Sequence, residues 1–347
     1  MMKPIPRRKV CRFLAHRGIQ LIVGITSYSL LSCQAGKSLI SDNDAIEAKI
    51  LSESGDFLDE VNRLKKLALP ANSRLYQPPT FNELKSFKLL AKDLLYQNLN
   101  EVLNRANSLN YELIKFIDAT TKQVFYGLRE KLKPGLPIRG WGSYFINFSY
   151  RANALLEIPH ILFDEFSEDI GAQVFLISVS RGLLIAGAHR NANGINTADV
   201  CNPINSIFQV VHKTWVSSNT KTWQIHGFGH VTKLSFPNNT MSVLSNGQGV
   251  VTNEILDLSQ RMKIRNFQAY TYNNLLPSNQ INQQANQGIA GTTFLPLAAT
   301  HNIQGKYSHK IGAAFTHVEL DESSRFNAQN RDEVAKIIAE SIQSLAK

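Results

Sequence analysis

Four apolar, strand-like stretches of this sequence end at residues that can bind a metal ion or carry out acid–base chemistry. The stretches are "ALLEIP", "LLIAGA", "TWQI" and "AAFTHV", and the residues at or just beyond their ends are His160, Arg190, His226 and Glu319, respectively. In open α/β sheets, ligands bind in the crevice outside the carboxyl ends of the strands. We therefore expect these four residues to meet at one site.

This residue set suits metal-assisted hydrolysis. Two neutral imidazoles and one carboxylate can hold a zinc ion and leave one coordination position open for water. The ion activates that water and polarises a carbonyl group, while a further carboxylate can take the proton and return it to a leaving amine. A guanidinium can clamp a substrate carboxylate or stabilise an oxyanion. The sequence thus predicts Zn²⁺ bound by His160 and His226, with Glu319 as general base and Arg190 as the substrate-binding residue.

The third zinc ligand has two candidates, because Asp164 and Glu165 follow His160 by four and five residues. We favour Glu165 and keep Asp164 as the alternative. His230 competes with His226 for the second imidazole, but it lies further from the end of the predicted strand.

The predicted strand "AAFTHVEL" alternates in character, so His317 and Glu319 share one face and Val318 and Leu320 share the other. The apolar pair is expected to face packed helices, which leaves Glu319 directed toward the crevice. The remaining histidines are expected to be structural or solvated: His189, His212, His301, His309 and His317.

The elements that would position these residues alternate between strand and helix from residue 154 onward. Strands are predicted at 154–159, 183–188, 222–226, 241–245, 266–270 and 313–320, and helices at 167–181, 205–215, 253–262 and 331–346. Such alternation is typical of an α/β fold with a mostly parallel or mixed central sheet flanked by helices. Residues 275–310, rich in Asn, Gln and Gly, are predicted to form a long loop of the kind that often has a function.

The residues before 154 are expected to form an N-terminal helix and β extension and a tether. Thr80 and Glu83 form a capping-box pattern at the start of a helical stretch, 81–109. Residues 112–130 indicate two strands around a turn at 118–121. The predicted organisation is a tether at 33–80, the helix and β extension at 81–153, and a catalytic region at 154–347.

The first 33 residues resemble a bacterial lipoprotein signal. Basic residues precede an apolar run at 19–31, which is too short for a comfortable membrane span and suits a signal-peptide core. The run ends in "LLSC", which resembles a lipobox, a motif whose cysteine is lipidated and becomes the first mature residue. We expect residues 1–32 to be a signal peptide and Cys33 to anchor an exported protein to the bacterial cell membrane or outer membrane. An ordinary signal peptide and an uncleaved anchor are the alternatives.

The charge of the chain argues against a nucleic-acid partner. The formal net charge is +10, but residues 1–32 hold six basic residues and no acidic one. The rest of the chain has 31 basic and 27 acidic residues, so no basic footprint for phosphates is left. Apart from Cys11 in the signal and Cys33, the chain contains only Cys201, which excludes a disulfide framework.

Several short motifs resemble the zinc carboxypeptidase-type amidohydrolases, a grouping that includes N-formylglutamate amidohydrolases and poly-γ-glutamate hydrolases. These motifs are a His-x-x-x-x-Glu pair after an early strand, "HRN", a strand ending in "QIHGF", and a C-terminal "HVEL", and the similarity covers about residues 140–347. The resemblance implies that His160, Glu165 and His226 are zinc ligands, that Glu319 is the catalytic carboxylate and that Arg190 binds substrate.

The chain departs from the true carboxypeptidases in its ligand spacing, because Phe163 stands where their His-x-x-Glu pattern requires an acid. The resemblance therefore implies the zinc hydrolase class rather than carboxypeptidase specificity. The expected substrate is a small molecule or peptide with an amide bond near a carboxylate.

Two other classes compete with this interpretation. A serine hydrolase is excluded, because "SVSRG" lacks the first glycine of a nucleophile elbow and lies at a predicted helix end. A non-catalytic lipoprotein that binds a cell-envelope ligand remains the alternative.

Overall fold

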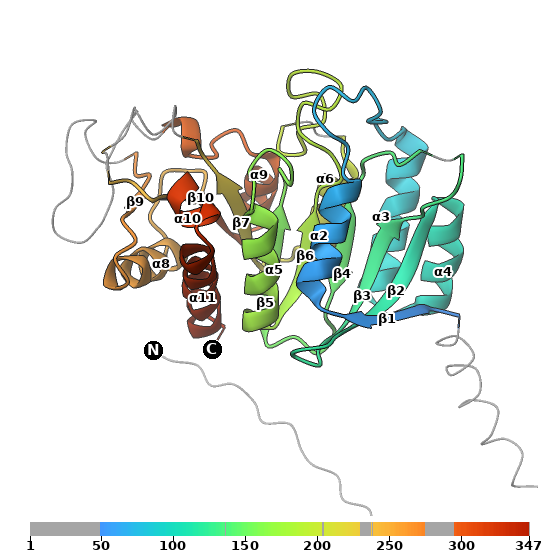
Figure 1. Ribbon diagram of the computed structural model, residues 1–347, viewed down its shortest axis with the longest axis horizontal. Coiled ribbons are helices and arrows are strands. Elements are labelled where there is room, and N and C mark those ends of the chain that lie inside the picture. The colour runs from blue at the N-terminus through green and yellow to red at the C-terminus, as the bar shows by residue number, and fades with distance from the viewer. Residues whose placement is uncertain are drawn as a thin grey trace, which may run out of the picture. The chain divides into compact units, whose positions relative to one another are not determined.

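A ten-stranded mixed sheet runs through the part of the chain that the computed structural model describes, which is residues 49–346 without 136, 203–204, 230–236, 238 and 275–294. The strand order is β1-β2-β3-β4-β6-β5-β7-β10-β8-β9. The strands are β1 (Leu51–Gly55), β2 (Tyr111–Asp118), β3 (Val124–Glu130), β4 (Ser143–Ile146), β5 (Ala152–Ile158), β6 (Ser180–Ile185), β7 (Lys221–Gly227), β8 (Ser242–Ser245), β9 (Ala269–Thr271) and β10 (Ala314–Leu320). Helices cover both faces of this sheet (Figure 1), so the predicted α/β fold class is confirmed.

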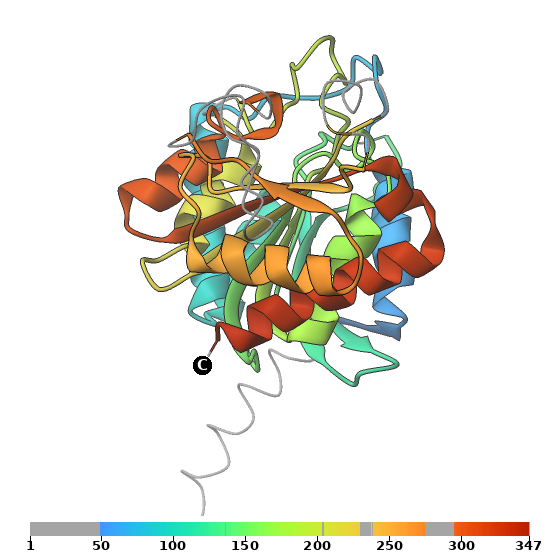
Figure 2. The same ribbon diagram turned by 90° about the vertical axis from the view of Figure 1, so that its left-hand side faces the viewer.

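The helices of the described residues are α2 (Phe57–Leu67), α3 (Phe81–Leu95), α4 (Leu99–Ser108), α5 (Ser167–Ser178), α6 (Ile207–Trp215), α8 (Asn253–Ile264), α9 (Ile303–Lys310), α10 (Glu322–Phe326) and α11 (Ala328–Ser344). Helices α2, α5 and α11 lie in front of the sheet in Figure 1, and α3 and α4 lie behind it. The view along the sheet separates these two layers (Figure 2).

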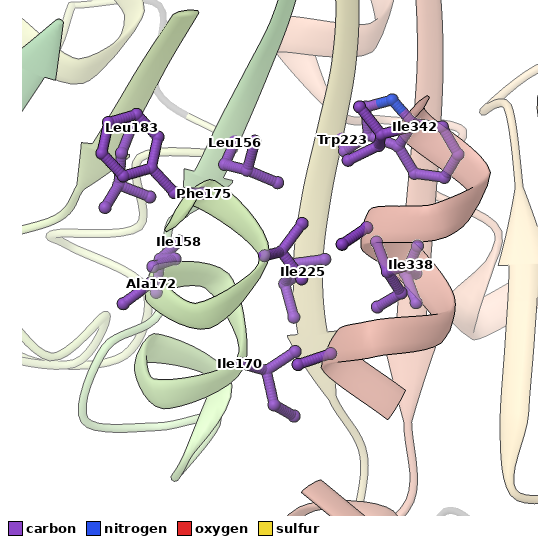
Figure 3. Packing of buried hydrophobic residues seen from close by; sticks show 14 of the residues in the cluster. Leu156, Ile158, Ile170, Ala172, Phe175, Leu183, Trp223, Ile225, Ile338 and Ile342 are labelled. Atoms are coloured by element: carbon purple, nitrogen blue, oxygen red, sulfur yellow. The ribbon is translucent and has the colours of Figure 1, made fainter. Parts of the chain in front are cut away.

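Two apolar cores, one on each face of the sheet, hold the layers together. Alternate residues of β5 divide between them: Leu156 and Ile158 pack in the core under α5 and α11, whereas Leu155 packs with α3 and α6. Figure 3 shows the first core, where Ile170 of α5 and Ile338 of α11 lie close to the strand residues.

The sheet contains a point at which the direction of its connections reverses. Strand β5 pairs in parallel with β6 on one side and with β7 on the other. Helix α5, between β5 and β6, packs in one core, and α6, between β6 and β7, packs in the other. The crevice between the carboxyl ends of β5 and β7 is thus the topological switch point, the usual place for a ligand in such sheets.

The predicted helix at 81–109 is two helices in the structure. The capping box at Thr80 and Glu83 begins α3 as expected. Gln97 takes a positive φ of 60°, a left-handed conformation that a helix does not continue through, so the chain breaks there and restarts as α4. The expected hairpin at 112–130 is present as β2 and β3.

The extension and the predicted tether differ from expectation, because both are built into the same sheet. Strand β4 pairs with β6, and β1 pairs in parallel with β2. Helix α2 buries Phe57 and Val61 completely. Residues 69–77 then run beside the loop after β6: Leu69 N–H donates to the Gly187 carbonyl at 3.0 Å, and Arg74 N–H donates to the Ala192 carbonyl at 2.9 Å. Residues 51–77 therefore do not form a tether.

The predicted long loop at 275–310 also differs in its last part, where α9 forms with Asn302 as its N-cap; residues 275–294 lie outside the described part. The predicted signal peptide and Cys33 lie outside it as well. Among the described helices, none has the length and apolar character that crossing a membrane requires.

Candidate metal centre

The site predicted from the strand ends lies at the topological switch point. His160 lies two residues after the end of β5, and His226 is the next-to-last residue of β7. Glu319 lies opposite His226 in the parallel register of β10 and β7. All three side chains are buried. They line a cleft of about 690 Å³ together with Asp164, Arg190 and His317.

Asp164 lies between the two histidines. Its Oδ2 atom is 3.1 Å from Nδ1 of His160 and 3.0 Å from Nδ1 of His226. A hydrogen-bonded turn brings it there, because the Asp164 N–H donates to the His160 carbonyl at 2.8 Å. Glu165, the favoured third ligand, is exposed, and the structure brings Asp164 rather than Glu165 to the histidines.

The outer nitrogens of both histidines have their own partners. Nε2 of His160 is 3.1 Å from Oδ1 of Asp199, and Nε2 of His226 is 2.9 Å from Oε1 of Gln224. A histidine that gives its Nε2–H to an acceptor presents a bare lone pair at Nδ1. Partners of this kind on the far nitrogen fix the ring orientation of metal-binding histidines.

Oδ2 of Asp164 faces the Nδ1 lone pairs of both histidines at about 3 Å, and these atoms repel unless a positive charge lies among them. In the protein without a metal ion, a proton meets part of this need. Burial acts to lower the pKa of His160, but Asp164, Cys201 and Asp199 together raise that pKa well above the ordinary value. Burial likewise acts to raise the pKa of Asp164, but His160 and His226 together lower it below the ordinary value.

The three side chains fit a divalent cation. The ligand atoms of His160, Asp164 and His226 all lie within 4.8 Å of one another, and all three residues are buried. Two imidazoles and one carboxylate form a common catalytic donor set for zinc, which leaves one coordination position open.

A second grouping of His160, Asp199 and Cys201 fits a cation less well. Burial raises the pKa of Cys201 to about 11, so the thiol keeps its proton, whereas a metal needs the thiolate. Asp199 already accepts hydrogen bonds from the Cys201 N–H at 2.9 Å and from Nδ2 of Asn202 at 2.8 Å. Arg190 donates to the same carboxylate.

Arg190 also lines this cleft, and the structure shows what holds it. It pairs with Asp199, and its Nε donates to Oδ1 of Asn196 at 3.0 Å. Its guanidinium also lies 5.1 Å from the ring centroid of Phe163, which is half-exposed.

Glu319 and His317 line the cleft, and each has a polar atom without a hydrogen-bond partner among the described residues. Oε2 of Glu319 and Nδ1 of His317 are buried and have no hydrogen-bond partner among the described residues. Oε1 of Glu319 is 3.7 Å from Nε2 of His317. Burial, and then the charge of Asp164, raise the pKa of Glu319 to about 8. Burial, and then His226, lower the pKa of His317 well below its ordinary value, so this imidazole is neutral.

Sequence reasoning missed three residues of the site. Asp199 and Gln224 contact the histidines from behind, and His317, expected to be structural, lines the cleft. His317 and Gln224 carried a signal, because strand alternation places them on the faces of Glu319 and His226, respectively. Asp199 lies in an irregular loop where no periodicity points to it.

Comparisons with known proteins assign no family to the chain. No protein-family model matches the sequence, and no curated protein matches it. A bacteriophage poly-gamma-glutamate hydrolase is similar in structure with a TM-score of 0.38 and 9% identity, over 61% of this chain and 93% of that chain. A candidate metallopeptidase from Shewanella denitrificans has a TM-score of 0.33 and 9% identity, over 73% of this chain and 90% of that chain. At these scores, neither likeness is close enough to place the chain in a family.

Proposed function

We propose that this protein is a zinc-dependent hydrolase that cleaves an amide or peptide bond near a substrate carboxylate. The observation that carries the proposal is the convergence of Nδ1 of His160 and Nδ1 of His226 on one oxygen of Asp164, at 3.1 and 3.0 Å. His160, Asp164 and His226 would hold the ion. When bound, the ion supplies Lewis acidity toward a water molecule and a carbonyl group.

Glu319 is the proton carrier in this mechanism. Its buried carboxylate faces the same cleft from the strand next to His226. Its pKa of about 8 in the metal-free protein lies close to neutral pH, which is where an acid–base group works best. A cation nearby favours its ionised form, so Glu319 can take a proton from water and then return it to the leaving amine.

Arg190 and His317 complete the substrate site. Arg190 lies at the rim of the cleft, and its guanidinium can bind the substrate carboxylate. His317 is neutral and buried beside Glu319, which suits it to a hydrogen bond with a reacting oxygen rather than to an ion pair.

We also propose that the protein is exported and held at the bacterial cell membrane or outer membrane by a lipid on Cys33. The support is the order of basic residues, apolar run and "LLSC" in the sequence. Such an anchor would confine hydrolysis to substrates of the cell envelope.

The direct test combines metal analysis with a substrate panel. The purified protein should hold about one zinc ion per chain, and it should cleave N-acyl amino acids or γ- or α-linked peptides only in the metal-loaded form. Ligand binding without zinc, unchanged by His160→Ala, would instead support the non-catalytic lipoprotein.

A further inference from the structure

A buried polar cluster lies behind the candidate metal centre and takes no part in the chemistry above. Its members are Glu157 on β5, His212 on α6, Gln224 on β7, and Asn302 and Gln304 at the start of α9, and all are at most 6% exposed. Burying polar groups costs free energy unless each finds a partner. A cluster of this size in the core of a sheet therefore calls for a physical reason.

Gln224 joins this cluster to the metal centre. The register of β5 and β7 sets Glu157 opposite Gln224, and Nε2 of Gln224 donates to Oε2 of Glu157 at 2.9 Å. The other carboxylate oxygen of Glu157 is 2.6 Å from Nδ1 of His212. On its opposite side, the Gln224 amide presents Oε1 to Nε2 of His226 at 2.9 Å.

A backbone donor fixes the oxygen side of the Gln224 amide. Oδ1 of Asn302 accepts the Gly305 N–H at 3.0 Å as the N-cap of α9. The amide nitrogen of Asn302 must then face the other way, and it donates to Oε1 of Gln224 at 2.6 Å.

A backbone acceptor fixes the nitrogen side. Nε2 of Gln304 donates to the Val200 carbonyl at 2.9 Å, so Oε1 of Gln304 is left to face Nε2 of Gln224 at 3.5 Å. A reversed Gln224 would set its NH₂ group against that of Asn302 and its oxygen against the carboxylate of Glu157. Only one orientation of the Gln224 amide satisfies all of its neighbours.

This orientation decides which nitrogen of His226 carries the proton. Because Gln224 presents an oxygen, Nε2 of His226 must donate, and a neutral imidazole has only one N–H to give. Nδ1 is then left unprotonated, 3.0 Å from Oδ2 of Asp164, and that oxygen accepts its hydrogen bond from Nδ1 of His160 at 3.1 Å instead. A histidine binds a metal only through an unprotonated nitrogen.

We propose that Gln224 is a positioning residue: locked in one amide orientation by Glu157, Asn302 and Gln304, it keeps the proton of His226 on Nε2 and leaves Nδ1 free for a divalent cation. The inference rests on the proposed metal-dependent function for its purpose. The tautomer itself can be measured whether or not a metal binds.

The first test is the tautomer of His226 in the unmodified protein. Histidine ¹⁵N chemical shifts, measured with and without zinc, should show a proton on Nε2 of His226 in both forms. A proton on Nδ1 in the metal-free form would overturn the inference. Failure of the wild type to take up zinc would contradict the proposed function, while the metal-free spectrum would still decide the tautomer.

The second test measures zinc affinity by competition with a chromophoric chelator. Gln224→Met keeps the length of the side chain and removes its acceptor, so we expect about 10–100-fold weaker zinc binding, the usual effect of losing such a partner.

Gln209→Met is the matched control. Gln209 is 2% exposed and accepts from Nε2 of Gln304 at 2.8 Å, but it makes no hydrogen bond to Gln224 or His226 among those that the structure shows. Its replacement should lower stability and leave zinc affinity unchanged. Equal loss of affinity in Gln209→Met and Gln224→Met, or wild-type affinity in Gln224→Met, would show that Gln224 does not act as a positioning residue.

Discussion

Glu319 and His226 are direct neighbours across two parallel strands, paired in the register of β10 and β7. The separation between the proposed proton carrier and a proposed metal ligand is therefore set by the main-chain hydrogen bonds of the sheet. A site built on strands holds its geometry more closely than one built on loops. This relationship makes the charge of Glu319 testable without disturbing the metal ligands.

Replacing Glu319 with Gln should remove most of the turnover and leave the metal in place. The substitution keeps the shape of the side chain and removes its ability to carry a proton, a role worth about 10²–10⁴-fold in rate. Zinc content and substrate affinity should stay near those of the wild type in the same preparation. Normal turnover, or loss of the zinc together with the fold, would make Glu319 a structural residue.

The third metal ligand can be identified by a pair of adjacent substitutions. Asp164→Asn should lower the zinc content well below one ion per chain, because Asp164 lies between the two histidines. Glu165→Gln changes the charge by the same amount at an exposed position and should leave the zinc content unchanged. Metal analysis after exhaustive dialysis decides between them, and the reverse result would return the assignment to Glu165.

Replacing either histidine by Ala should also release the metal. His160→Ala and His226→Ala each remove one donor from a set of three, while the far-ultraviolet circular dichroism spectrum should remain close to native. Full zinc occupancy in the double variant would mean that other histidines bind the ion.

Cys33→Ser should prevent lipidation if the lipobox prediction is right. The variant should incorporate no labelled fatty acid and should appear in the soluble exported fraction instead of with membranes. Unchanged membrane association would rule out Cys33 as the anchor.

The pH dependence of stability should show the contribution of Asp118. Burial acts to raise the pKa of this carboxyl, but hydrogen bonds from Thr121 and Phe57 lower it below the ordinary value of 3.8. A folded-state pKa below the unfolded one gives stability that is present above pH 3.8 and is lost as the pH falls through the folded-state pKa.

Urea unfolding of Asp118→Asn across pH tests this dependence. At neutral pH we expect the variant to be about 1–3 kcal/mol less stable than the wild type, because backbone donors lose a charged acceptor. The difference should shrink in acid. Asp59→Asn, at an exposed position in the first turn of α2, is the control and should differ little at any pH.

The sequence predicted the strand ends well because two strong signals agreed there. Apolar runs marked the strands, and parallel strands deliver the residues at their carboxyl ends to one edge, so His160, His226 and Glu319 were expected together and lie together. The choice between Asp164 and Glu165 depended on one turn after β5, in which the Asp164 N–H donates to the His160 carbonyl. The residue types in this segment do not predict that turn.

Strand β1 was missed for a different reason. It is a polar strand at the edge of the sheet, and its residues are exposed or half-buried, so no hydrophobic pattern marks it. Its structure comes from pairing with β2, a long-range contact that local sequence does not encode.

The contact between residues 69–77 and the loop after β6 links the order of folding to the competence of the site. Asn72 N–H donates to the Asn191 carbonyl at 3.0 Å, and Nδ2 of Asn193 donates to the Tyr76 carbonyl at 2.7 Å. These partners stand 119 and 117 residues apart in the sequence, and contacts over such distances form late because closing a long loop costs entropy. The loop that contains Arg190 can therefore reach its native structure only after residues 69–77 and β6 have come together. A deletion within residues 69–77 would therefore remove the hydrogen-bond partners of the loop that contains Arg190.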